Sequence, residues 1–290
     1  MITTRGLFKR YDATVALDGV DVNVPAGVVY GLVGPNGAGK TTLLSILAGL
    51  RSPTSGTVSI DADPSRMAVL PDAPRFEPWL TGRDVVRLAH TLAGGEGDDV
   101  EQVLGDAGLA DSADRRVAGY SRGMLQRLGL AATVVSRPDV LMLDEPASAL
   151  DPIGRREVLD LVRRLRGEAT VVFSSHILAD VQEVSDWIGI LDRGVLRFEG
   201  PVGDLLGAGA GMTYEVRVRD GIAGAVRVLQ ARPWVASVEA LGDRVLRVRA
   251  ASLEDAERDL LPALVESGAA VTSVTPSTPT LEEVFLEVTR

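Results

Sequence analysis

Short apolar segments alternate with amphipathic segments over the first 200 residues of the chain. Residues 28–33, 140–143 and 170–173 are mainly apolar and show no alternation with polar positions. Runs of this kind are typical of strands that are buried on both faces of a parallel sheet. Because a helix is expected over residues 152–166, between the last two strands, the order strand–helix–strand predicts an α/β fold.

Residues from about 75 to 135 have helical patterns instead. Thr81 is expected to cap one helix, because Asp84 follows it at the spacing of a capping box. Ser121 is expected to cap a second helix over residues 124–135. We therefore expect a helical lobe beside the sheet.

The pattern changes after a glycine-rich stretch, of which residues 205–211 are interpreted as a linker. The elements expected beyond it are a strand at 214–218, a helix at 223–231, strands at 235–241 and 245–248, a helix at 253–265 and a strand at 270–274. This order is that of a ferredoxin-like domain, followed by an amphipathic helix at 281–288. The sequence thus predicts a large domain over residues 1–204 and a small α+β domain over residues 212–290.

Composition and charge narrow the classes of function. The chain has 290 residues, a formal net charge of −10 and no cysteine. The acidic balance argues against a nucleic-acid partner, which requires a basic face. The absence of cysteine excludes disulfides, thiolate metal sites and cysteine nucleophiles. No apolar segment is long enough to span a bilayer and the N-terminus lacks a signal-peptide pattern, so a membrane role requires a partner.

A candidate phosphate-binding loop follows the strand expected at residues 28–33. Residues 34–41 fit the pattern G-x-x-x-x-G-K-T between a strand and a helix, which disfavours a chance glycine turn. Backbone N–H groups of such a loop close around phosphate oxygens, and the helix N-terminus favours their negative charge. Lys40 is expected to reach the β- and γ-phosphates, and the Thr41 hydroxyl to bind Mg²⁺. The expected nucleotide-binding residues are Gly34, Pro35, Asn36, Gly37, Ala38, Gly39, Lys40, Thr41 and Thr42.

Two acidic residues, Asp144 and Glu145, follow the apolar strand at residues 140–143. Ligands of parallel sheets bind at the carboxyl ends of the strands. Asp144 is therefore expected to hold Mg²⁺, and Glu145 to act as the general base on the attacking water. Acids at strand ends are also common as exposed turn residues, but the phosphate-binding loop upstream favours the functional interpretation.

Together these motifs resemble the nucleotide-binding subunit of an ABC transporter. The resemblance rests on residues 34–42, on Tyr-Ser-Arg-Gly-Met at 120–124 followed by Gln-Arg at 126–127, and on Leu-Asp-Glu-Pro at 143–146. It covers residues from about 2 to 200, and the motifs occur in the order of the family. It implies a P-loop NTPase cassette with a parallel sheet, an antiparallel subdomain and a helical lobe. The implied reaction is ATP hydrolysis, with ATP and Mg²⁺ as cofactors.

The resemblance implies further roles at matching positions. Tyr11 matches the aromatic residue that stacks on adenine, although ordinary packing is the commoner role of a single tyrosine. Ser121 and Gly123 match the signature motif, which contacts the γ-phosphate held by a second subunit, and a helix cap at Ser121 is compatible with this role. Asp151 matches the D-loop, and His176 matches the switch histidine that senses the γ-phosphate.

One position departs from the family pattern. Asp72 stands where the family usually has Gln or Glu, and its shorter carboxylate is still expected to approach Mg²⁺ and water. Phe76 and Trp79 follow in a proline-stiffened loop, beside the region that receives the membrane subunit in this family. These two aromatic residues are either docking anchors or part of the core of the helical lobe.

The resemblance also implies partners and location. Two copies, or one copy and a paralogue, are expected to bind two ATP molecules head to tail and to work with a separate membrane permease on the cytoplasmic face of the cell membrane. The C-terminal portion, especially residues 279–286, resembles the extension of ABC-2-type exporter ATPases, so export is expected. The alternative is a soluble ABC ATPase that serves assembly, DNA repair or translation. The single cassette and the spacing of about 80 residues between Lys40 and Ser121 disfavour repair and translation.

Overall fold

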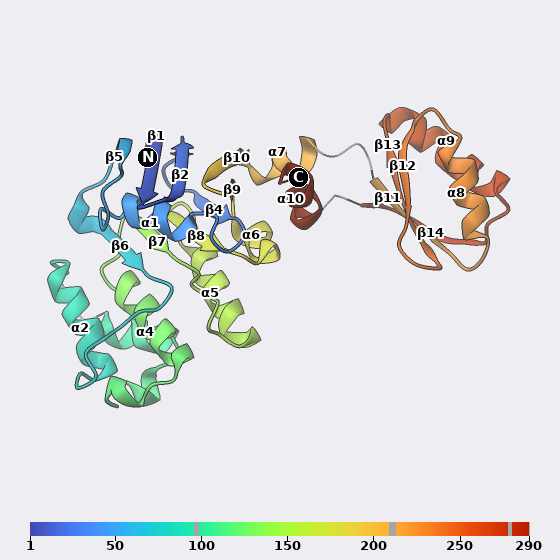
Figure 1. Cartoon of the computed structure of the whole chain (residues 1–290). Helices are drawn as coiled ribbons and strands as arrows, with labels where there is room; N and C mark the ends of the chain where they lie inside the picture. The colour runs from blue at the N-terminus through green and yellow to red at the C-terminus, as the bar shows by residue number, and fades with distance from the viewer. Residues whose placement is uncertain (96–98, 209–212, 278–279, 290) are drawn as a thin grey trace. The chain divides into compact units, whose positions relative to one another are not determined.

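Two compact units make up the chain, one formed by residues 1–202 together with residues 288–289 and the other by residues 203–287. None of the helices in the described part of the chain is long and apolar enough to cross a membrane. Each unit has a hydrophobic core of its own. Figure 1 shows the computed structural model, which describes residues 1–95, 99–208, 213–277 and 280–289.

A six-stranded sheet forms the centre of the first unit, with its strands in the order β10-β9-β4-β8-β7-β6. The strands from β9 to β6 are parallel, whereas β10 runs antiparallel to β9 at one edge. Both β4 and β7 are buried at every position, which confirms the parallel sheet expected from their apolar sequences. The strands are β4 (Val29–Val33), β6 (Met67–Leu70), β7 (Val140–Leu143), β8 (Thr170–Ser175), β9 (Trp187–Asp192) and β10 (Val195–Pro201).

A smaller antiparallel sheet packs with α1 (Lys40–Leu47) on the same core. The long strand β1 pairs with three others, and all three pairings are antiparallel. Ile2 of β1, Leu43 of α1 and Leu32 of the central sheet belong to one buried cluster, so the three layers share a single core. The strands are β1 (Ile2–Tyr11), β2 (Thr14–Val20), β3 (Asn23–Val24) and β5 (Ser55–Ile60).

The expected helical lobe is formed by α2 (Gly82–Leu92), α3 (Val100–Asp106) and α4 (Arg122–Val134). Thr81 and Asp84 form the predicted capping box, because each side chain bonds the backbone N–H of the other residue. Ser121 is the N-cap of α4, and its Oγ accepts from the N–H of Met124. Single 3₁₀ turns lie at Pro64–Arg66, Ala110–Ser112 and Val117–Gly119.

Three further helices follow the strands of the central sheet: α5 (Pro152–Arg164), α6 (Leu178–Val184) and α7 (Val202–Ala208). Asp151 caps α5, since its Oδ1 accepts from the N–H of Gly154 at 3.1 Å. Contacts join α5 to α6 along their length. Only His176 and Ile177 separate the end of β8 from the start of α6.

The second unit contains a four-stranded antiparallel sheet in the order β12-β13-β11-β14. This order and the alternation with two helices confirm the ferredoxin-like domain. Thr213, at the start of the first strand, pairs with Ser277, at the end of the last. Val216 and Leu246 of the sheet pack with Leu229 of α8 in its core. The elements are β11 (Thr213–Val218), α8 (Ile222–Gln230), β12 (Val235–Ala240), β13 (Val245–Ala250), α9 (Leu253–Glu266), β14 (Val271–Ser277) and α10 (Leu281–Val288).

Several boundaries differ from the expected ones. The helix expected to begin at residue 124 starts at Arg122, directly after its cap. The helix of the phosphate-binding loop, which the sequence predicts over residues 40–50, ends at Leu47, because Gly49 takes a left-handed conformation with φ of 70°. The expected linker at 205–211 coincides in its first part with α7, and residues 209–211 lie outside the described part of the chain.

Candidate active site

The loop between β4 and α1 requires glycine for two physical reasons. Gly37 and Gly39 have φ values of 81° and 108°, a region that favours glycine. A Cβ atom on Gly34 would lie 2.1 Å from the carbonyl oxygen of Leu191, and one on Gly39 would lie 2.5 Å from that of Ala16. Both neighbours are backbone atoms. The glycines therefore let the loop bend tightly at the N-terminus of α1, where an anion is favoured.

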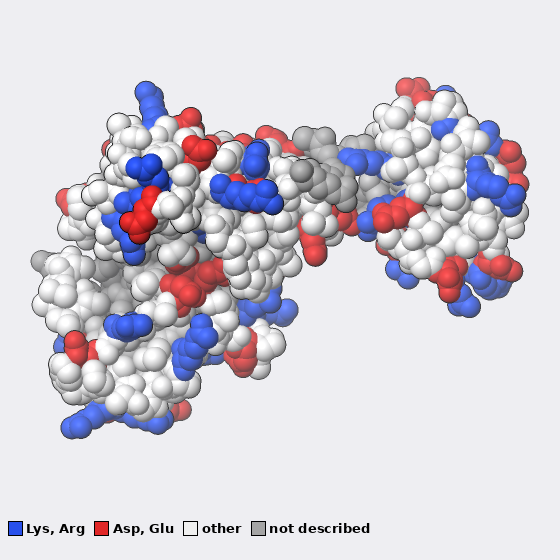
Figure 2. Space-filling model, in the orientation of Figure 1, with Lys and Arg blue, Asp and Glu red and all other residues white. Residues whose placement is uncertain are grey.

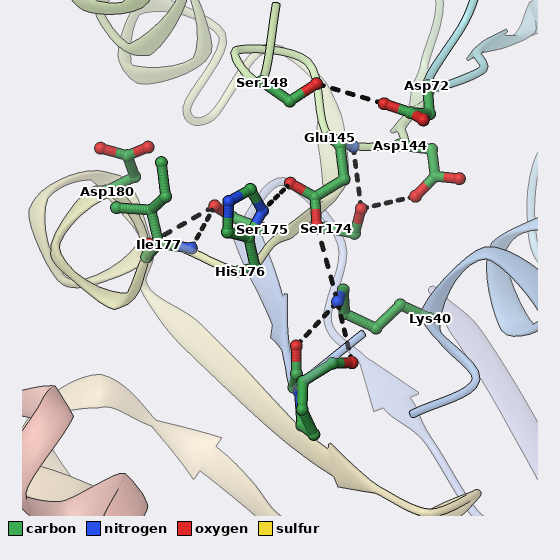
Figure 3. Close-up of polar contacts among 12 residues, drawn as sticks. Lys40, Asp72, Asp144, Glu145, Ser148, Ser174, Ser175, His176, Ile177 and Asp180 are labelled. Carbon is green, nitrogen blue, oxygen red and sulfur yellow. Dashed lines mark hydrogen bonds and ion pairs between the residues drawn. The ribbon is translucent and has the colours of Figure 1, made fainter. Parts of the chain in front are cut away.

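Lys40, the first residue of α1, is only 7% exposed. Its Nζ donates to the carbonyl oxygen of Gly34 at 2.7 Å and lies 3.4 Å from that of Pro35. The same Nζ is 3.6 Å from Oε1 of Glu145 (Figure 3). The ammonium group is thus held between the glycine loop and a carboxylate, where it suits the binding of a phosphate.

Asp144 and Glu145 lie at the end of β7, as expected, and both are fixed by Ser174 of β8. The buried Ser174 hydroxyl donates to Oδ1 of Asp144 at 2.6 Å and accepts from the N–H of Glu145 at 2.9 Å. Glu145 has a φ of 49°, which is rare for a residue other than glycine. Ser174 therefore holds two adjacent acids in different orientations (Figure 3).

His176 comes directly after β8, the strand beside β7. Its Nδ1 lies 2.8 Å from Oε2 of Glu145, and its side chain is 49% exposed. The Glu145 carboxylate therefore lies between the Lys40 ammonium and the His176 imidazole, one on each oxygen (Figure 3). A carboxylate in this position can accept a proton from water, while the two flanking groups can stabilise negative charge that develops nearby.

The chemistry of the donors also fits Mg²⁺ bound together with a nucleotide. The described residues contain no group of three or more His, Asp or Glu side chains that is arranged to hold a metal by itself. Mg²⁺ in nucleotide sites is commonly bound by one or two carboxylates, with phosphate oxygens and water completing its shell. The buried carboxylate of Asp144 and the exposed Thr41, at the start of α1, are suitable protein ligands.

Two expected site residues make their described contacts outside this cluster. Asp72 accepts from the Ser148 hydroxyl at 3.2 Å and is exposed, so it is joined to the loop after Glu145 (Figure 3). The ring of Tyr11, at the end of β1, lies against two cations. Nζ of Lys9 is 4.9 Å from the ring centroid, and the guanidinium carbon of Arg51 is 5.6 Å from it. Adenine stacking at Tyr11 and metal binding at Asp72 remain predictions.

Ser121, Gly123 and Asp151 line one pocket at the start of α4. A Cβ atom on Gly123 would lie 3.5 Å from the carbonyl oxygen of Ala149, so the first turn of α4 packs on the loop that precedes α5. Arg127, one turn farther along α4, reinforces this contact through Glu157 of α5, with 2.9 Å between Nη1 and Oε2. The structure therefore brings the residues that match the signature motif and the residue that matches the D-loop together within one chain.

The two aromatic residues after Asp72 have different surroundings. Phe76 packs against the core of the helical lobe, as one of the two sequence interpretations expected, and also lines a groove between the lobe and β6. Trp79 is 63% exposed. Leu92 of α2 lines the same groove as Phe76 and is 79% exposed.

Ser174 is the main residue of the site to which the sequence reasoning assigned no function. The signal available in the sequence was the pair of serines, Ser174 and Ser175, that directly follows the apolar segment at residues 170–173. A hydroxyl in the buried part of a sheet needs a partner, and here the partner is the neighbouring strand end.

Comparison with known proteins shows that each of the two units matches a protein family. Residues 17–148 match the family described as ABC transporter, and residues 208–289 match that of the "ATP-binding protein DrrA1-3-like, C-terminal domain". The chain is 35% identical to the uncharacterized ABC transporter ATP-binding protein YxlF of Bacillus subtilis, over 99% of both chains. It is 34% identical to the daunorubicin resistance ATP-binding protein DrrA3 of Streptomyces coeruleorubidus, over 99% of this chain and 95% of that protein.

A solved structure of the ATP-binding subunit of an ABC transporter has the same fold as the first unit. It is 26% identical to this chain, with a TM-score of 0.67, over 72% of this chain and 95% of that one. The full-length similarity to transporter proteins does not favour the alternative of a soluble assembly, repair or translation factor. The chain therefore belongs to the ABC transporter family, as an ATP-binding subunit that hydrolyses ATP.

Proposed function

We propose that Glu145 is the general base of ATP hydrolysis and that Lys40 and His176 stabilise the charge on the phosphate being transferred. The observation that carries this proposal is the position of the Glu145 carboxylate, between Lys40 and His176 and beside the glycine loop. The β- and γ-phosphates would lie in that loop, against the backbone of residues 34–39 and the α1 N-terminus. The water attacking the γ-phosphate would give its proton to Glu145.

Mg²⁺ would be held by Asp144 and the Thr41 hydroxyl, together with phosphate oxygens of ATP. Ser174 supports this role, because its hydrogen bond fixes the orientation of the Asp144 carboxylate. A metal bound there would neutralise part of the phosphate charge. Asp72, which is joined to the loop after Glu145 through Ser148, would approach the metal and its water with a shorter side chain than the usual Gln or Glu.

The active form would be a head-to-tail dimer, of two copies or of one copy and a paralogue. In this arrangement Ser121 and Gly123 of one chain would meet the γ-phosphate held by the glycine loop of the other. Ser121 is exposed and lies at a helix N-terminus, which is a suitable anion-binding position. ATP would then favour the closed dimer, and loss of the γ-phosphate would release it.

The dimer would drive export through a separate membrane subunit, and the chain would lie on the cytoplasmic face of the cell membrane. The groove lined by Phe76 and Leu92, with Trp79 in the same loop as Phe76, is the proposed docking surface for that subunit. A nucleic-acid partner is not proposed. On the face seen in Figure 2, basic side chains are interspersed with acidic ones, and the net charge of the whole chain is −10.

The roles of Glu145 and Lys40 can be separated by two substitutions. Glu145→Gln keeps the shape of the side chain but removes the base, so ATP should still bind while kcat falls by about 100-fold or more. This variant should also accumulate as an ATP-bound dimer, as measured by size-exclusion chromatography with Mg²⁺ and ATP. Lys40→Ala should instead lose affinity for ATP in a direct binding assay.

Glu168→Gln is the matched control, because Glu168 is an exposed glutamate that follows α5. It should leave turnover and dimerisation unchanged. Wild-type turnover in Glu145→Gln would show that another group is the base. Unchanged ATP affinity in Lys40→Ala would refute the proposed role of the glycine loop.

A further inference from the structure

A half-buried ion pair between Arg155 and Asp180 joins α5 to α6 next to the proposed catalytic cluster. Nε of Arg155 donates to Oδ1 of Asp180 at 2.7 Å, and Nη2 of the same guanidinium also bonds that oxygen. Asp180 is only 3% exposed. Burial raises the pKa of the Asp180 carboxyl, and the Arg155 guanidinium opposes this by favouring its charged form.

Both members of this pair lie in the first turn of their helix, close in sequence to site residues. Arg155 comes four positions after Asp151, the cap of α5. Asp180 comes four positions after His176, and Figure 3 shows it on the helix that follows the histidine. The pair therefore fixes the start of α6 against the start of α5.

The contact between Glu145 and His176 closes a ring of interactions. The chain runs from Glu145 through Asp151 to Arg155, and the ion pair joins Arg155 to Asp180. Asp180 is linked along the first turn of α6 to His176. The Nδ1 atom of His176 lies 2.8 Å from Glu145, where the ring began. Two residues alone separate β8 from α6, so a displacement of the start of α6 must move the His176 side chain. The ion pair, which fixes the start of α6, therefore also affects the position of His176.

We infer that Arg155 and Asp180 are positioning residues, which hold the start of α6 so that His176 stays in contact with Glu145. This inference rests on the proposed function, because it assumes that the pair of Glu145 and His176 takes part in hydrolysis. Neither Arg155 nor Asp180 touches the reacting atoms in this arrangement. They act by holding His176, which contacts Glu145, in position.

The chain offers a matched control in a second ion pair between the same helices. Nη2 of Arg163 lies 2.7 Å from Oε1 of Glu183, at an exposed position near the ends of α5 and α6. Arg155→Gln and Arg163→Gln remove the same group from the same pair of helices. Arg155→Gln should lower kcat between about 10- and 100-fold with little change in KM for ATP, since misplacement of a catalytic group by about 1 Å has effects of this size. Arg163→Gln should change neither constant, and equal effects of the two substitutions would overturn the inference.

Loss of stability can be separated from loss of position. Arg155→Gln leaves the buried charge of Asp180 without its partner, which is destabilising. The double variant Arg155→Gln with Asp180→Asn has no charge at this place, so its melting temperature should recover while kcat stays low. Arg155→Lys, which keeps the charge, should recover part of kcat.

Wild-type kcat in the double variant would show that the pair has only a stabilising role and would overturn the inference. This outcome is distinct from a failure of the proposed function, which would appear as wild-type turnover in Glu145→Gln. Binding of ATP is measured separately in every variant, so that a change in affinity is not mistaken for a change in turnover.

Discussion

Among the residues of the site, Glu145 has the least common backbone conformation. A φ of 49° places a non-glycine residue in the left-handed region, which costs on the order of 1–3 kcal/mol. Such a conformation persists only where its surroundings fix it. Here the N–H of Glu145 donates to Ser174, while its two carboxylate oxygens face Lys40 and His176. One serine on the neighbouring strand therefore supports the backbone that aims the proposed base.

Ser174→Ala tests this support. The substitution removes the donor to Asp144 and the acceptor of the Glu145 N–H, so stability should fall by about 1–3 kcal/mol. It should also lower kcat, because both acids lose their common anchor. Steady-state ATPase assays and urea unfolding measure the two effects. Ser237→Ala, at an exposed serine of β12, is the control and should change neither kcat nor stability. An unchanged kcat in Ser174→Ala would show that other groups hold Asp144 and Glu145.

Among the elements, α2 has a start that is defined by side chains. Thr81 and Asp84 satisfy each other's backbone N–H groups, and the Thr81 hydroxyl also bonds the Asp84 carboxylate at 2.6 Å. These hydrogen bonds lower the pKa of Asp84, because they favour its ionised form. The hydrogen bonds to the Asp84 carboxylate therefore stabilise the cap most while Asp84 is ionised, whereas the bond from the Asp84 N–H to the Thr81 hydroxyl does not depend on that charge.

Thr81→Ala should destabilise the protein by about 1 kcal/mol near neutral pH. A carboxyl whose pKa is lowered by folding stabilises the folded state above its unfolded pKa of about 3.9, and this contribution is lost as the pH falls through the lower folded value. The difference in stability between wild type and variant should therefore narrow below about pH 4. Urea unfolding of wild type and variant, near neutral pH and below about pH 4, measures this difference in stability. A difference that stays constant with pH would mean that the hydroxyl does not act on the charged carboxylate.

Local signals predicted the elements of this fold better than they predicted its contacts. The apolar runs of β4 and β7 and the caps of α2 and α4 are properties of neighbouring residues, so they can be found in the sequence. The bond between Ser148 and Asp72 joins residues 76 positions apart, and that from Ser174 to Asp144 joins residues 30 apart. Such contacts depend on the order of strands in the sheet and on side-chain rotamers, which local sequence does not define.

At the scale of the whole molecule, exposed apolar side chains near the helical lobe mark the surface proposed for docking of the membrane subunit. Trp79 and Leu92 are each more than half exposed, and Phe76 lines the groove between the lobe and β6. Large exposed aromatic residues are common centres of protein interfaces. Because the central sheet and the lobe both line this groove, a partner bound there would contact both.

Trp79→Ala should weaken binding of the proposed membrane subunit. A loss of about 2 kcal/mol, or roughly 30-fold in Kd, is typical of such an anchor. ATP turnover by the isolated chain should not change. Leu50→Ala, at another exposed apolar residue, is the control. Equal Kd values for Trp79→Ala and wild type would place the docking surface elsewhere.

The pairing of Thr213 with Ser277 has a consequence for how such a chain can be built. The ferredoxin-like sheet begins and ends at neighbouring positions, so the chain leaves and returns at nearly the same point in space. A segment with adjacent ends can be inserted, removed or exchanged in a single genetic event without redirecting the sequence on either side. In this sense residues 213–277 have the geometry of a module that can be exchanged without redirecting the chain of the ATPase portion.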